Sequence, residues 1–157
     1  MHAEIKVLKL QKQFCQFYHN KMSLKYSPKN NPRVIIIQKL YGKFFNREEN
    51  LTFPKHRFKK FIKDVVNGTI ERDEIITSEV EQHLKMDLKL KNMDKVFQII
   101  IKSAIFELLY KPKTSIKIII KEYLNASNFF INESQTRYLN ALLDKISKKI
   151  RKFNGRI

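Results

Sequence analysis

The sequence predicts an all-α protein of about six to seven helices. Three observations indicate this class. Glycine and proline are rare, at 3 and 4 of 157 residues. Long stretches are rich in Leu, Ile, Lys and Glu, which favour helices. Apolar side chains make up 43% of the chain, enough to fill a core and too many for a disordered protein. We expect one domain, or two small subdomains that share a core.

The N-terminal segment differs in character from the rest. Residues 4–20 have the pattern of a basic amphipathic helix, and two prolines with paired asparagines at 23–32 indicate a linker. A translation start at Met22 is an alternative to one at Met1. The predicted organisation is a basic extension and linker at 1–28, dispensable on that alternative, a domain at 29–153 and a tail at 154–157.

Six helices are expected after the linker. Pro32 suits the first position of a helix that continues through RVIIIQKLYGKFF. Residues 55–68 carry a helical stripe of Phe58, Phe61, Ile62 and Val65, and Gly68 is expected to end that helix.

The acidic segment 70–84 repeats the stripe with Ile75, Ile76, Val80 and Leu84. The most apolar segment, Asp94 to Tyr110, is expected to be the central buried helix, and Pro112 follows its end. Two further helices are predicted at roughly 115–129 and 133–152.

Charge is the strongest compositional feature. The chain has 32 Lys+Arg against 15 Asp+Glu, a formal net charge of +17. Residues 71–87 hold six acids and two basic residues, or −4, so the remainder carries +21. Such a surface attracts polyanions, with nucleic acid the usual partner and an anionic membrane the second. The excess of lysine over arginine also arises in genomes rich in A and T, so charge alone does not choose.

Several classes of site are not predicted. Cys15 is the single cysteine, which excludes an internal disulfide, and the four histidines lack metal-ligand spacing. Glycine-rich phosphate loops, nucleophile elbows and paired-histidine metal motifs are absent, so we expect no enzyme, cofactor or metal. The longest apolar runs, such as Val34–Ile37, are too short to span a bilayer, and no cleavable signal is evident. We expect a cytoplasmic protein with no membrane partner.

Aromatic and basic residues lie together at two places. Tyr41 follows Arg33 by about two helical turns, and Phe129 and Phe130 precede the pair Arg137-Tyr138. Single-stranded RNA is typically held by aromatic faces that stack on bases and by cations on phosphates. Core packing is the alternative for each aromatic side chain.

Five stretches in order resemble the NusB family of transcription antitermination factors. They are RVIIIQKLY, FIKDVVNGTIERDEII, IIIKSAIFELLY, IKIIIKEYLNASNFF and RYLNALLDKI, and the resemblance extends over residues 33–149. Each is weak alone, and their order and spacing make the match specific. The resemblance implies a compact all-α fold of two helical subdomains and a non-enzymatic protein.

The resemblance also implies a function and partners. The expected protein binds boxA-type single-stranded RNA together with the ribosomal protein NusE. With other Nus factors and RNA polymerase it promotes read-through, mainly in ribosomal RNA operons.

Site residues follow from the same resemblance, position by position. Phe97 stands where the family has an acid on its NusE-facing side. The amide of Asn140 is expected to brace a neighbouring helix or loop. The RNA-binding positions are Lys29, Arg33, Gln38, Tyr41, Phe130, Arg137 and Tyr138. The structural signature is Glu107, Glu122, Asn140 and Asp144.

Two other functions remain open from the sequence. One is a stand-alone NusB-like RNA-binding domain, related to that of ribosomal RNA cytosine methyltransferases. The other is a membrane-surface or general polyanion-binding protein that uses its basic N-terminal helix.

Overall fold

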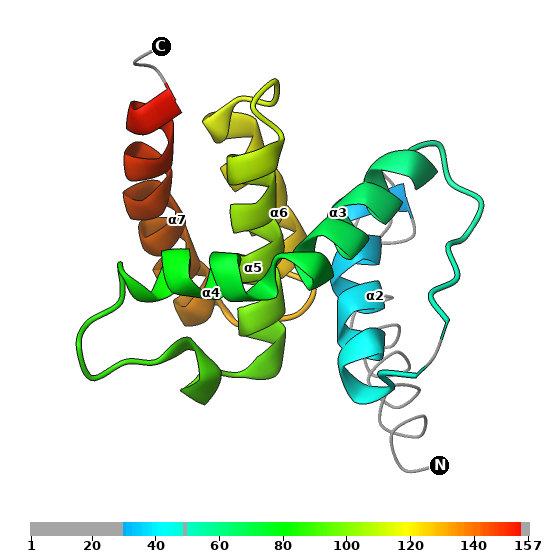
Figure 1. Cartoon of the computed structure of the whole chain (residues 1–157), viewed down its shortest axis with the longest axis horizontal. Coiled ribbons are helices and arrows are strands. Elements are labelled where there is room, and N and C mark those ends of the chain that lie inside the picture. Colours follow the sequence, from blue (N-terminus) through cyan, green and yellow to red (C-terminus); the bar gives the residue numbers. More distant parts are fainter. Residues whose placement is uncertain (1–29, 49, 155–157) are drawn as a thin grey trace.

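The structure is a computed structural model that describes residues 30–48 and 50–154. The expected N-terminal helix, the linker up to residue 28 and Lys29 lie outside this part. Within it the protein contains six α-helices and no strand, which confirms the all-α class (Figure 1). The elements are α2 (Pro32–Phe45), α3 (Lys59–Glu71), α4 (Asp73–Glu81), the short 3₁₀ helix η2 (Leu90–Asn92), α5 (Lys95–Tyr110), α6 (Ile116–Ser127) and α7 (Glu133–Asn154).

Local capping signals account for the starts of three helices. The Asn31 side chain accepts hydrogen bonds from the backbone N–H groups of Arg33 and Val34, and Pro32 follows it at the first helical position. Asp94 caps α5 by accepting from the N–H groups two and three residues on, and Ser115 caps α6. Each cap satisfies backbone donors that have no partner inside the helix.

Two expectations about helix extent are wrong. Gly68 does not end a helix: α3 continues to Glu71, and Gly68 is buried inside it. No glycine among the described residues has a positive φ, so Gly68 is not a left-handed cap. The buried apolar stripes of α3 and α4 are also narrower than the sequence predicts. Phe58 lies just before α3 and is 45% exposed, and Ile75 on α4 is 59% exposed.

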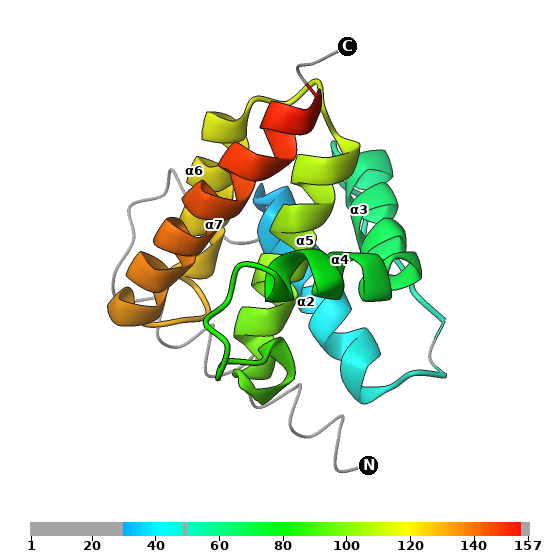
Figure 2. The same cartoon turned by 60° about the vertical axis from the view of Figure 1, so that its left-hand side comes forward.

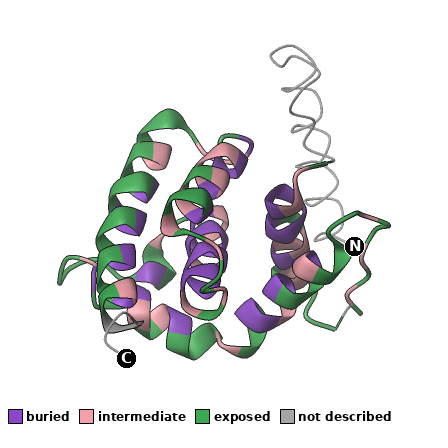
Figure 3. Cartoon of the chain, turned by 90° about the horizontal axis from the view of Figure 1, so that it is seen from above, coloured by how far each residue is buried: buried purple, intermediate pink, exposed green. Residues whose placement is uncertain are grey.

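Helix α5 forms the centre of the molecule, as its apolar sequence predicted. It contacts each of the other five α-helices, and 11 of its 16 residues are buried. Helices α2 and α3 lie on one side of it and α6 and α7 on the other, while α4 crosses it (Figures 1 and 2). The buried faces turn toward one another in Figure 3, and one hydrophobic cluster runs through all six helices. The two helical groups therefore share a core.

Candidate nucleic-acid interface

Arg33 lies inside this core and forms a buried ion pair. Its Nε donates to Oε2 of Glu107 at 3.0 Å and its Nη2 to Oε1 at 3.1 Å, so the contact is bidentate. The guanidinium also lies over the rings of Phe61 and Tyr123, at 5.2 and 5.5 Å from their centroids. Only 10% of the Arg33 side chain is exposed. The ion pair links α2 to α5. Little of the Arg33 guanidinium is exposed for contact with RNA.

Two residues of the structural signature, Glu107 and Glu122, lie in the same cluster as Arg33. Glu107 is buried, and its burial raises the pKa of its carboxyl, while the Arg33 guanidinium acts in the opposite direction. Burial, and then the charge of Glu107, raise the pKa of Tyr123 well above its usual value. Glu122 is half-buried, with its Oε2 4.0 Å from Nη1 of Arg33. The carboxylates of Glu107 and Glu122 thus offset the positive charge of Arg33 where α2, α5 and α6 meet.

Tyr138 presents an aromatic face at the surface. It lies in the second turn of α7 and is 42% exposed. Its ring stacks on that of Phe97, with centroids 5.7 Å apart and planes 24° apart. Phe97 is only 3% exposed, in the first turn of α5. A buried ring therefore orients an exposed one, and Phe97, which stands where the family has an acid, is itself part of the core.

Tyr41 lies near the same end of α5. Burial raises the pKa of its phenol, and so does the charge of Asp94, the residue that caps α5. One turn further along α2, Phe44 is 37% exposed, and the ammonium of Lys95 lies 4.3 Å from the centroid of its ring. The start of α5 thus has aromatic side chains of α2 on one side and Tyr138 of α7 on the other.

The remaining expected RNA-binding residues are placed differently. Gln38 is exposed on α2. Arg137 is exposed and pairs with Glu133, Nη1 to Oε1, at 2.8 Å. Phe130 lies in the loop between α6 and α7, as predicted, but is half-buried against the core, and its neighbour Phe129 is buried. For Phe129 the core alternative is correct.

Two signature residues lie on the surface of α7. Asn140 is exposed, and its side chain has no hydrogen bond to the other residues that the structure describes. No residue in the described part of the chain supplies the partner expected for this amide: Leu139 and Leu142 are buried in the core, and Asn140 lies on the outer face of α7. Asp144 is exposed as well and pairs with Lys148 at 2.7 Å.

Sequence reasoning missed Phe44 and Lys95. A signal was available, because Phe44 follows Tyr41 by three residues and the two share a face of α2. Lys95 directly follows the capping residue Asp94, so its position at the start of α5 could also be predicted. The contact between Phe44 and Lys95 could not be predicted, because it joins two helices that are far apart in the sequence.

Other kinds of site find no support in the described part of the chain. Residues 30–48 and 50–154 contain no group of three or more His, Cys, Asp or Glu side chains placed to hold a metal ion. No helix within these ranges has the length and apolar character needed to cross a membrane.

Comparison with known proteins gives one consistent result. The model of the NusB family matches residues 30–148. The transcription antitermination protein NusB of Rickettsia massiliae is 34% identical over 92 residues, which are 59% of this chain and 56% of that protein. The Rickettsia felis protein of the same name is 28% identical over 127 residues, 76% of this chain and 79% of that one.

The solved structure of T. maritima NusB is similar in fold. Its TM-score is 0.67 at 21% sequence identity, over 78% of this chain and 92% of that one. The R. massiliae match spans little more than half of that relative's length.

Proposed function

This chain belongs to the NusB family, and we propose on that basis that it is a transcription antitermination factor. It binds boxA-type single-stranded RNA together with the ribosomal protein NusE. With other Nus factors it acts on RNA polymerase in the cytoplasm and promotes read-through, mainly in ribosomal RNA operons. As a member of this family the chain is not an enzyme.

The observation that carries the proposal is the exposed ring of Tyr138, held by Phe97 at the start of α5. Stacking of a base on an aromatic ring contributes most to the binding free energy when the ring is already oriented, because less side-chain entropy is lost on binding. Tyr41 with Phe44 and Lys95 supplies further aromatic surface and a cation near the same helix end. These residues, with Gln38 and Arg137, form the proposed RNA face.

Titration by fluorescence anisotropy tests this function. The probes are a labelled boxA-type RNA and a scrambled RNA of the same composition, each with and without added NusE. We expect the boxA-type strand to bind more tightly, and NusE to increase the difference. Equal affinity for the two RNAs in both conditions would refute the proposal.

A further inference from the structure

Helix α7 connects the proposed RNA face to a second surface. Taken at 3.6 residues per turn from Tyr138, the positions that return to the same face include Ala141, Lys145, Lys149 and Lys152. All five side chains are exposed. At a rise of about 1.5 Å per residue, Lys149 and Lys152 lie roughly 16–21 Å from Tyr138 along the helix axis. We call Lys145, Lys149 and Lys152 the lysine stripe.

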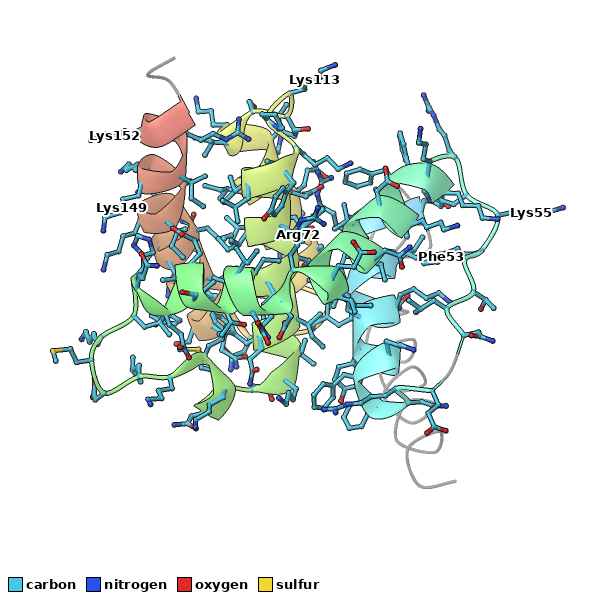
Figure 4. All side chains as sticks on the ribbon, viewed as in Figure 1. Phe53, Lys55, Arg72, Lys113, Lys149 and Lys152 are labelled. Atoms are coloured by element: carbon cyan, nitrogen blue, oxygen red, sulfur yellow. The ribbon has the colours of Figure 1, made fainter. Side chains whose placement is uncertain are left out.

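The stripe lies in strongly basic surroundings. Residues 145–154 contain five cations and no acid, and residues 108–121 contain four cations and no acid. Arg151 joins these two segments: its Nη1 donates to the carbonyl oxygen of Pro112 at 2.8 Å and its Nη2 to that of Thr114 at 3.0 Å. These two hydrogen bonds hold the loop that carries Lys113 close to the end of α7. Figure 4 shows Lys149 and Lys152 on the outer side of α7 and Lys113 on the loop above.

The ammonium groups of the lysine stripe form no ion pair with the residues that the structure describes. Lys148, beside the stripe, pairs with Asp144, and the ammonium of Lys145 donates to the backbone oxygen of His83 at 3.0 Å. Lys149 and Lys152 have no acidic partner among the described residues. Several like charges held together without counter-charges repel one another, and a bound polyanion removes that cost.

Helix stabilisation does not account for the pattern. Cations in the last turn of a helix interact favourably with its dipole, which covers Lys152, but this effect fades within one turn and does not reach Lys145. Lys113 and Lys117 flank the start of α6, whose first turn contains no acid. Positive charge is unfavourable at that end of a helix.

We propose that the lysine stripe continues the RNA path that begins at Tyr138. It contacts the phosphates of nucleotides that flank the bases stacked on the aromatic face, without reading their sequence. This inference rests on the proposed RNA-binding function and adds to it a second contact surface on the same helix. RNA suits the stripe better than a flat membrane does, because the lysines follow one line that leads away from an exposed aromatic ring.

The test compares two lengths of RNA and two matched variants. The probes are a labelled boxA-type strand alone and the same strand extended by uridines on its 5′ or its 3′ side. The variant Lys149→Gln/Lys152→Gln removes two charges of the stripe and spares Lys145, which contacts His83. The control Lys60→Gln/Lys63→Gln removes two exposed charges at the same spacing on α3.

We expect the full-length protein to bind one of the extended strands more tightly than the short one. The stripe variant should lose most of that gain and keep its affinity for the short strand. On the extended strand, its slope of log K against log salt should be shallower by about 1.4, at about 0.7 per phosphate contact. The control should retain both the gain and the slope.

Three results would overturn the inference. The first is equal affinity of the full-length protein for short and extended strands. The second is an equal loss in the stripe and control variants, which would indicate a general charge effect. The third is that the stripe variant loses binding to phosphatidylserine vesicles while its RNA binding is unchanged. Failure of the proposed function has a different signature, namely equal binding of boxA-type and scrambled short strands.

Discussion

At the level of single residues, Tyr138 combines an exposed aromatic face with a buried neighbour that sets its orientation. We predict that Tyr138→Ala weakens binding of boxA-type RNA by about 1–3 kcal/mol, the usual value for one base stacked on an aromatic side chain. Anisotropy titration measures the loss, and circular dichroism should show an unchanged helical fold.

Tyr110 provides the matched control. It is 38% exposed near the end of α5, where the guanidinium of Arg72 lies 4.6 Å from its ring centroid. Tyr110→Ala should leave RNA affinity unchanged. Loss of helical signal in Tyr138→Ala would instead mean that this ring mainly supports the core, and it would remove Tyr138 from the RNA face.

At the level of the elements, the ion pair of Arg33 and Glu107 ties α2 to the central helix. We predict that Glu107→Gln lowers the free energy of unfolding by about 3–5 kcal/mol, because it leaves the charge of Arg33 buried without its counter-charge. The double variant Arg33→Met/Glu107→Leu should lose less than the single one, since both charges are removed together. Urea titration measures both.

The exposed pair of Asp144 and Lys148 is the control for this prediction. Asp144→Asn should cost less than about 1 kcal/mol, as is typical of solvent-exposed ion pairs. If Glu107→Gln were equally mild, the buried pair would not hold the two helices together.

The contact between α3 and α5 depends on Gly68. A Cβ at this position would lie 2.2 Å from Cζ of Phe106, a buried ring of the central helix. We predict that Gly68→Ala destabilises the protein by about 1–3 kcal/mol, the usual cost of overpacking a core. Intrinsic helix propensity alone would favour the substitution by about 1 kcal/mol, so the sign of the effect separates the two causes.

Gly42 in α2 serves as the control, because a Cβ there meets no atom within 4 Å. Gly42→Ala should leave thermal stability unchanged or raise it. A stabilising effect of Gly68→Ala would show that Phe106 moves away at little cost.

At the level of the whole molecule, the net charge of +17 favours binding to polyanions, and such binding weakens as salt is added. We predict that log K for single-stranded RNA falls linearly with log salt, with a slope near −0.7 for each phosphate neutralised. Anisotropy titrations over a range of potassium chloride concentrations measure it. Binding to anionic vesicles as tight as binding to RNA would favour the membrane-surface alternative, and co-sedimentation of full-length protein with such vesicles tests that outcome.

The sequence by itself determined the class of the fold, the number of helices after the linker and the central position of α5. These follow from signals that act over a few residues. Asn31 with Pro32, Asp94 and Ser115 cap helices through groups two or three positions away, and apolar periodicity marks which faces are buried. The resemblance to the NusB family also came from the sequence, because it depends on the order of short motifs.

Only the tertiary structure decided what several of these residues do. Arg33 meets a partner 74 residues away in the chain, and the ring that supports Tyr138 belongs to another helix. The sequence predicted a helix end at Gly68, but this residue lies inside α3 against Phe106. It predicted a bracing amide at Asn140, which is exposed on α7. Such roles depend on how helices rotate and pack against each other. Local sequence does not specify that register, because many residues on several helices set it together.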